Sequence, residues 1–341
     1  MSFAKSSKGA IFIAALIVVF LFFGSFLIGQ YPIDPSGVVD IIGSGIFGYE
    51  SNQSSMAQSI VWKVRLPRIL AALIVGAALS IAGAVYQSLF KNPMVSPDIL
   101  GATSGAGFGA AISILLSLPY IFIQTNAFIV GLLAVALTYG ICVKVSRGKD
   151  ALLMLILGGM IVSTLFSSFT TIIKYVADPD SKLPEITYWL MGSLSTVNMR
   201  DVGFLLLPLL IGIIPIVALR WQLNAMAFGD EEAKSMGLNV NALRAIFIFC
   251  STLLASASVA VAGMVGWVGL IIPHMARFIV GPNSNELLPM SLLTGGGFLL
   301  IVDNFCRNLF TVELPLGILT SLIGAPFFFY LLYIRARKNE R

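Results

Sequence analysis

The chain has 341 residues, of which 57% are hydrophobic and only 11% are Asp, Glu, Lys or Arg. Its mean hydropathy of +0.94 excludes an ordinary soluble globular protein. The net charge of +5 follows from an excess of bases in the loops that flank the membrane, so nucleic-acid binding is not needed to explain it.

Apolar stretches of about 20 residues recur along the chain, each long enough to cross a bilayer core of about 30 Å. The stretches are continuous and do not alternate, which predicts helices and not a β-barrel. We expect an all-α integral membrane protein, with residues 1–341 forming a single transmembrane domain and the first span retained. The ten predicted spans are 9–29, 64–88, 97–117, 121–145, 150–174, 202–220, 242–262, 266–280, 287–305 and 316–334. Pro273 predicts a break in the eighth span.

The distribution of basic residues predicts the orientation of these spans. With the N-terminus inside, 14 of the 21 Lys and Arg residues lie on the cytoplasmic side and 7 lie outside. Cytoplasmic loops normally carry the excess of bases, so we expect both termini in the cytoplasm.

A glycine series opens the third span. Gly101, Gly105 and Gly109 are four residues apart, which predicts a helix face without side chains that another helix approaches closely. The series does not follow a strand, and no GxxxxGK[ST] occurs anywhere in the chain. The chain therefore carries no recognisable ATP site.

Polar side chains follow one another at helical spacing in the fifth span. They are Ser163, Ser167, Thr170 and Lys174. The hydroxyl groups of this stripe can form hydrogen bonds to neighbouring helices. The connection that follows, 177–187, is predicted to be an outer loop.

Charged residues are concentrated in FGDEEAKSMGLNVNALR, at 228–244. Gly229 and Asp230 predict the start of a short helix, with Glu231 and Glu232 near its positive end. Gly237 predicts its end in the left-handed conformation. We place a cytoplasmic segment at 223–241, which is either a solvated linker or a rigid knob for a partner.

Catalytic and metal-binding motifs are absent from the sequence. His274 has no second ligand at suitable spacing, and Cys142, Cys250 and Cys306 fit small buried side chains. We therefore expect neither an enzyme nor a metal site. A secondary transporter would need ionisable residues in the membrane, which are scarce here. The exception is Asp303, predicted to face either Arg307 or the helix interior.

Several segments resemble the FecCD-type permeases of bacterial ABC importers, which take up iron-siderophore complexes, haem or cobalamin. GDEEAKSMGL (229–238) resembles the cytoplasmic coupling segment of these proteins, and YWLMGSLS (188–195) their central signature. The other similar segments are 65–93, 96–110, 263–283 and 313–332.

The resemblance implies a type II importer permease fold with inverted halves, in the bacterial inner membrane. It implies a second permease subunit, for which we favour a homodimer, an extracytoplasmic substrate-binding protein, and two cytoplasmic ATPases that supply ATP and Mg²⁺ binding. A ferric siderophore is the favoured cargo, with cobalamin or haem as alternatives.

Site residues follow from the same resemblance. It implies a translocation cavity lined mainly by the fifth span, and so by Ser163, Ser167, Thr170 and Lys174, with hydrogen bonding between helices as the alternative role of this stripe. The outer loop at 177–187 would shield this cavity or contact the binding protein. Coupling to the ATPase is implied for Gly229, Asp230, Glu231, Glu232, Ala233, Ser235 and Gly237, with Lys234 and Arg244 also at the partner's surface. Docking of the binding protein through its glutamates is implied for Arg65, Arg68 and Arg307. Snorkelling of these arginines to the membrane interface is the alternative.

Overall fold

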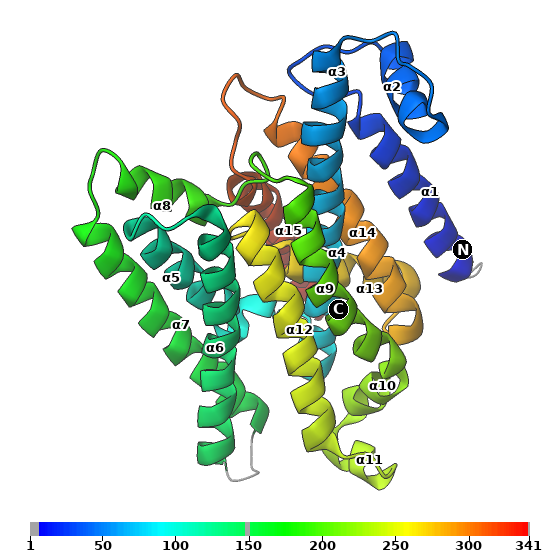
Figure 1. The fold of residues 1–341 in the computed structure, drawn as a ribbon. Helices are drawn as coiled ribbons and strands as arrows, with labels where there is room; N and C mark the ends of the chain where they lie inside the picture. Colours follow the sequence, from blue (N-terminus) through cyan, green and yellow to red (C-terminus); the bar gives the residue numbers. More distant parts are fainter. Residues whose placement is uncertain (1–6, 147–150, 340–341) are drawn as a thin grey trace.

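Each of the ten predicted spans corresponds to a helix in the computed structural model, which describes residues 7–146 and 151–339 (Figure 1). The helices are α1 (Ser7–Ser25), α4 (Leu66–Leu89), α5 (Ala102–Leu115), α6 (Tyr120–Ser146), α7 (Ala151–Val176), α9 (Met199–Ala218), α12 (Val240–Ala262), α13 (Val268–Val280), α14 (Ser284–Cys306) and α15 (Leu316–Asn339). Among the described residues, seven helices are long and apolar enough to cross a membrane. The helices α5 and α13, and the apolar part of α15 (Leu316–Tyr330), are shorter.

Shorter helices lie between the spans. They are α2 (Pro35–Phe47), α3 (Ser55–Ser59), the π-helix η1 (Ile60–Arg65), the 3₁₀-helix η2 (Pro97–Leu100), α8 (Lys182–Met191), α10 (Arg220–Phe228) and α11 (Asp230–Ser235). The connection predicted as an outer loop at 177–187 is therefore partly helical. Figure 1 shows α2, α3 and α8 at one end of the molecule and α11 at the opposite end.

The centre of the molecule is built around α4 and α12, the most buried of the long helices. The helix α4 packs against α9, α12, α13 and α14. Small residues allow close approach, since a Cβ on Gly76 would lie 2.2 Å from the carbonyl oxygen of Gly295. The ten spans divide into a first half that begins with α1 and a second half that begins with α9. Because α4 is the second span of the first half and α12 the second span of the second half, their equivalent positions fit inverted halves.

The glycine series of the third span acts largely as predicted. A Cβ on Gly105 would lie 2.7 Å from the Val130 carbonyl oxygen, and one on Gly109 would lie 2.5 Å from that of Asn126. Both glycines therefore allow α6 to pack closely against α5. Gly101 differs, because it precedes α5 with a φ of +92° and forms the turn after η2.

The predicted break at Pro273 is wrong. The helix α13 is continuous from Val268 to Val280 and contains the proline. The chain leaves the helical conformation earlier, between Gly263 and Trp267, and both of these residues have positive φ. Because Pro273 lies near the start of α13, its missing N–H removes only one early helical hydrogen bond.

Candidate functional site

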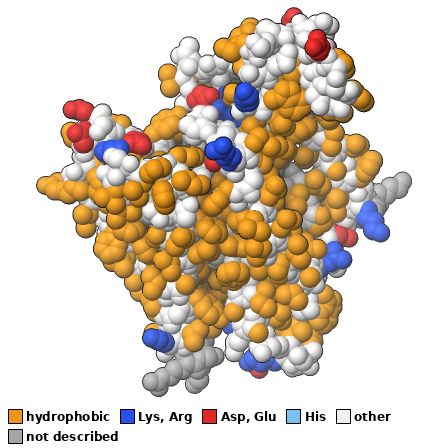
Figure 2. All heavy atoms as spheres, in the orientation of Figure 1, with side chains coloured by type: hydrophobic (Ala, Val, Ile, Leu, Met, Phe, Trp, Pro, Cys, Tyr) orange, Lys and Arg blue, Asp and Glu red, His pale blue; other side chains and the backbone are white. Residues whose placement is uncertain are grey.

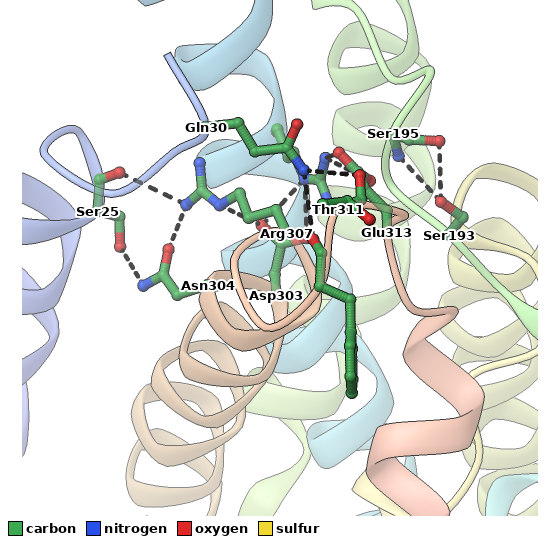
Figure 3. Close-up of polar contacts among 11 residues, drawn as sticks. Ser25, Gln30, Ser193, Ser195, Asp303, Asn304, Arg307, Thr311 and Glu313 are labelled. Carbon is green, nitrogen blue, oxygen red and sulfur yellow. Dashed lines mark hydrogen bonds and ion pairs between the residues drawn. The ribbon is translucent and has the colours of Figure 1, made fainter. Parts of the chain in front are cut away.

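A cluster of charged side chains joins three segments at the end of the molecule predicted to face outward (Figure 3). The carboxylate of Asp303, on α14, accepts Arg68 Nε of α4 at 2.9 and 3.1 Å. Nη1 of Arg68 donates to both carboxylate oxygens of Glu313, at 2.8 and 2.9 Å. Arg307 Nε lies 3.4 Å from Asp303 Oδ2. The cluster thus connects α4, α14 and the loop before α15.

The end of α1 is held by the same region. In Figure 3, Arg307 lies between Ser25, Asn304 and Asp303. Its Nη2 donates to Asn304 Oδ1 and, at 3.5 Å, to the carbonyl oxygen of Ser25. Asn304 Nδ2 in turn donates to Ser25 Oγ at 2.8 Å. This network connects the last turns of α1 and α14.

Arg65 holds the segment that follows α1. Its Nη1 donates to the carbonyl oxygen of Phe26, and its Nη2 donates to that of Tyr31 at 2.5 Å. Arg65 lies at the end of η1, so one side chain connects the start of α4 to the 26–34 segment. An unpaired buried guanidinium would be costly, and these carbonyl oxygens provide its partners.

The burial of the three arginines changes their predicted role. Arg65 is 3% exposed, and Arg68 and Arg307 are 5% exposed. In this structure a carboxylate of a docked protein reaches them only by displacing a partner within the chain. Their side chains also do not extend into a membrane interface, as snorkelling would require. The structure places the three arginines in one region, as the sequence predicted, but their side chains point inward.

The charged segment at 223–241 forms two short helices and a turn. Gly229, with φ of +151°, separates α10 from α11, and a Cβ there would lie 1.9 Å from Glu232 Oε2. Gly237 follows α11 with φ of +80°, and Asn239 caps α12 by accepting a hydrogen bond from Ala242 N at 3.1 Å. The predicted short helix and its left-handed end are confirmed.

The side chains of α11 divide into a buried and an exposed set. Ala233 is fully buried, whereas the side chain of Glu231 is 84% exposed and accepts Lys234 Nζ at 2.8 Å. This hydrogen bond raises the pKa of the Lys234 ammonium, which therefore stays charged. Phe228 and Met236 are 74% and 52% exposed. An exposed tip with both charged and apolar side chains is typical of a protein contact surface.

Arg244 does not lie at this surface. It is 4% exposed, and its Nη2 contacts Asp230 Oδ2 at 2.6 Å. The predicted contact of Arg244 with a partner is therefore wrong in this structure. The ion pair instead fixes the start of α11 to the first turns of α12, which stiffens the segment.

The polar stripe of the fifth span lies on α7 with mixed exposure. Ser167 is exposed, while Ser163, Thr170 and Lys174 are half-buried. Thr170 Oγ1 donates to the carbonyl oxygen of Phe166 at 2.9 Å, within its own helix. Such i to i−4 bonds satisfy a hydroxyl locally, so Thr170 is not needed for bonding between helices.

Several residues of these sites were missed or only partly recognised from the sequence. Glu313 accepts hydrogen bonds from Arg68, and Asn304 accepts one from Arg307. Asp230 forms an ion pair with Arg244. The sequence offered one signal for Glu313, because an acidic residue directly before an apolar span can pair with a basic residue at the same end of the membrane. Within the described residues, no cluster of three His, Cys, Asp or Glu side chains is arranged to hold a metal ion.

Comparison with known proteins places this geometry among transporters. The profile of the FecCD transport family matches residues 16–334. The molybdate import system permease MolB of Haemophilus influenzae is 40% identical over 306 residues, 90% of each chain. A probable iron chelatin permease of Helicobacter pylori is 36% identical and covers 83% of this chain and 85% of its own. The cobalamin permease BtuC of Halobacterium salinarum is 40% identical over 81% of this chain and 74% of its own.

A solved structure shares the fold. It is described as an inward-facing conformation of a metal-chelate type ABC transporter, and it aligns with a TM-score of 0.86 at 38% identity. The alignment covers 96% of this chain and 99% of that one. The arrangement of helices in Figure 1 is therefore that of a known membrane transporter.

Proposed function

Because this chain belongs to the FecCD family and is the permease subunit of an ABC importer, we propose that it carries a ferric-siderophore-type iron chelate across the membrane. It is not itself catalytic, and ATP binds to a partner ATPase. The observation that supports the coupled mechanism best is the rigid, exposed tip at α11.

The cargo is inferred from the relatives. The iron chelatin permease of Helicobacter pylori is 36% identical to this chain, and an Fe(3+)-citrate permease of Bacillus subtilis is 37% identical. These two relatives support an iron chelate. MolB and BtuC, each 40% identical, favour molybdate and cobalamin as the other candidates. Haem remains the alternative implied by the sequence resemblance.

The coupling step rests on α11 and its flanking glycines. We assign Gly229, Asp230, Glu231, Glu232, Ala233, Ser235 and Gly237 to the contact with the ATPase. Ala233 anchors the segment while Glu231 and Met236 face outward, so a push from the ATPase would be transmitted into α12 through the pair of Asp230 and Arg244.

The outer arginines support docking of the binding protein in an indirect way. Arg65, Arg68 and Arg307 hold the 26–34 segment and the 307–315 loop in place. These segments would form part of the docking surface. The glutamates of a binding protein would then contact the segments that the arginines support.

The translocation path would run along α7. We assign Ser163, Ser167, Thr170 and Lys174 to its wall. A cavity of about 610 Å³, lined in part by Asp98, Thr103 and Ser321, lies next to η2, which packs against α7. Hydroxyl groups offer weak contacts to a large chelate, which suits a carrier that must release its cargo.

The assembly would contain two copies of this permease, two ATPases and one binding protein in the bacterial inner membrane. Both termini would lie in the cytoplasm. The directions of the helices support placing both termini on the same side, because α1 leads toward α2 and α3 while α15 starts beside the 307–315 loop at that same end (Figure 1). The excess of bases predicted on the side of the termini supports the cytoplasm.

Uptake by a strain lacking this gene tests the proposed cargo. Radiolabelled ferric siderophore, molybdate and cobalamin are compared before and after the gene is restored. Loss of ferric-siderophore uptake alone, recovered with the gene, is the expected result. Loss confined to molybdate or cobalamin would replace the proposed cargo with that compound.

A further inference from the structure

An apolar groove runs between α6 and α12 on the membrane-facing side. It has a volume of about 420 Å³ and is lined by residues such as Leu133 and Ala136 of α6 and Ala245 and Phe249 of α12. Figure 2 shows that the middle of this face is almost entirely hydrophobic. The groove is thus suited to a hydrocarbon chain.

The groove adjoins a polar cavity at the α11 end. This second cavity has a volume of about 720 Å³ and shares Tyr139 with the groove. Along α12, Asn241 and Arg244 line the cavity, and Ala245 and Phe249 line the groove on the next turns. The two hollows therefore adjoin at Tyr139 and along α12, and α7 and α11 complete the wall of the polar one.

Basic side chains predominate in the lining of the polar cavity. Lys91, Lys234 and Arg244 line it together with Asp230, and Lys234 is paired with Glu231, which lies outside the lining. Asp230 is already paired with Arg244, and no carboxylate among the described residues lies within ion-pair distance of Lys91. Arg244 is 4% exposed, and its buried Nε has no hydrogen-bond partner there. Lys91 and the Nε of Arg244 are therefore the cationic groups left for an anion, with Lys234 beside them.

The dimensions match one leaflet of a membrane. Ile129 and Tyr139 are the outermost α6 residues of the groove, ten positions apart, which corresponds to about 15 Å along a helix. The hydrocarbon core of one leaflet has about the same thickness, half of the roughly 30 Å of the bilayer. Tyr139 lies at the junction, where aromatic side chains commonly meet lipid headgroups.

We propose that these two adjoining hollows together bind one anionic phospholipid, with its phosphate in the cavity of Lys91, Lys234 and Arg244 and an acyl chain in the groove between α6 and α12. Basic pockets between transmembrane helices bind anionic headgroups in this way. The proposed function places the site in the cytoplasmic leaflet, and this placement is the only part of the inference that rests on that function. The lipid would link α6 to α11 and α12, and so to the coupling segment.

Lipid binding to the purified, delipidated permease tests the proposal. Native mass spectrometry would compare phosphatidylglycerol with phosphatidylcholine of the same chains. We expect preferential retention of phosphatidylglycerol. Neutralising two charges in Lys91→Gln with Lys234→Gln should weaken its binding by roughly 25-fold, as each basic residue near a membrane adds about fivefold. The matched control, Lys63→Gln with Lys182→Gln, removes two lysines outside the site and should bind as the wild type.

The acyl-chain half of the site is tested separately. Ala245→Trp fills the groove and should weaken phosphatidylglycerol binding, whereas Leu137→Trp, on exposed α6 surface outside the groove, should not. Inorganic phosphate serves as the headgroup probe and should compete with the lipid in the wild type.

Three results would overturn the proposal. Equal retention of the two lipids would show unspecific binding. Phosphate binding combined with no effect of Ala245→Trp on the lipid would identify a site for free phosphate only. Unchanged lipid binding by the Lys91 and Lys234 variant, with loss of ATPase binding, would identify a protein interface. None of these readouts measures transport, so a wrong cargo or a failure of the proposed coupling would leave the lipid test intact.

Discussion

Asp303 is the residue on which the outer cluster depends. It is fully buried on α14 and contacts both Arg68 and Arg307. Two buried guanidinium groups near one another would repel if this carboxylate were absent. The arrangement explains how a chain with so few charges keeps an acid near the end of a transmembrane helix: the acid neutralises basic groups within the protein.

Removal of this carboxylate should destabilise the protein strongly. Asp303→Ala leaves Arg68 without one of its two acidic partners, and breaking a buried ion pair from one side costs about 3–5 kcal/mol. We expect a clearly lower midpoint of thermal unfolding in detergent, measured by tryptophan fluorescence at a fixed scan rate. Glu313→Gln is the control, because the side chain of Glu313 is 30% exposed and should matter much less. Similar midpoints for both variants would contradict the assigned role of Asp303.

Gly83 is a second residue at which a small substitution should lower the stability of the protein. A Cβ at this position would lie 1.8 Å from the carbonyl oxygen of Gly269, where α4 and α13 meet. Gly83→Ala should therefore force the helices apart and cost roughly 1–3 kcal/mol, as overpacking does. Gly203→Ala on α9 meets no atom within 4 Å and should be neutral or slightly stabilising. The unfolding midpoints of the two alanine variants check this, and an unchanged Gly83→Ala would refute it.

Among the elements, α11 combines a fixed base with an exposed tip. Its base is held by Ala233 and by the ion pair of Asp230 and Arg244. Its end depends on Gly237, whose φ of +80° other residues adopt only with strain. A short helix fixed at both ends can transmit a displacement, which a flexible linker cannot do.

Loss of the left-handed turn should loosen α11. Gly237→Ala meets no neighbouring atom, so its cost of about 1–2 kcal/mol comes from the backbone alone. Hydrogen exchange of the amides at 230–236 should become about 5 to 30 times faster. The control Gly203→Ala should leave this exchange unchanged. Unaltered protection in Gly237→Ala would mean that other contacts determine the order of α11.

Charge reversal on the tip should uncouple the permease from its ATPase. Glu231→Arg with Glu232→Arg should weaken ATPase binding by at least about tenfold and abolish transport, because like charges placed across an interface repel. A binding assay with the purified ATPase measures this. Glu185→Arg is the matched control, since Glu185 is also exposed and pairs with a lysine three residues away, but on α8. Full ATPase binding by the double variant would reject the coupling role.

At the scale of the whole molecule, alternating access should change the exposure of α7. Ser167→Cys introduces a thiol on the exposed side of the helix, and the native cysteines Cys142, Cys250 and Cys306 are buried. A membrane-impermeant maleimide should label position 167 in the assembled importer, and labelling should change when ATP hydrolysis is blocked. Leu207→Cys, an exposed apolar site on α9, should stay unlabelled. Constant labelling of position 167 in all states would remove it from the path.

By itself, the sequence determined the number and order of the long helices, because an apolar run of about 20 residues has few stable alternatives in a membrane. It also determined α11 and its end at Gly237, since caps and left-handed turns depend on a few adjacent residues. Helices of the length of α2, α8 and α10 were not predicted, because they are too short for hydropathy to distinguish them from loops.

Only the tertiary structure decided which charges meet. Arg68 and Asp303 are 235 positions apart, and Arg68 and Glu313 are 245 apart, so no local pattern indicates that these residues pair. The same holds for the site formed by Lys91 on one side and Arg244 on the other. Helix periodicity specifies the face on which a side chain lies, but the packing of separate helices determines its partner, and here packing turned the outer arginines from the surface into the interior.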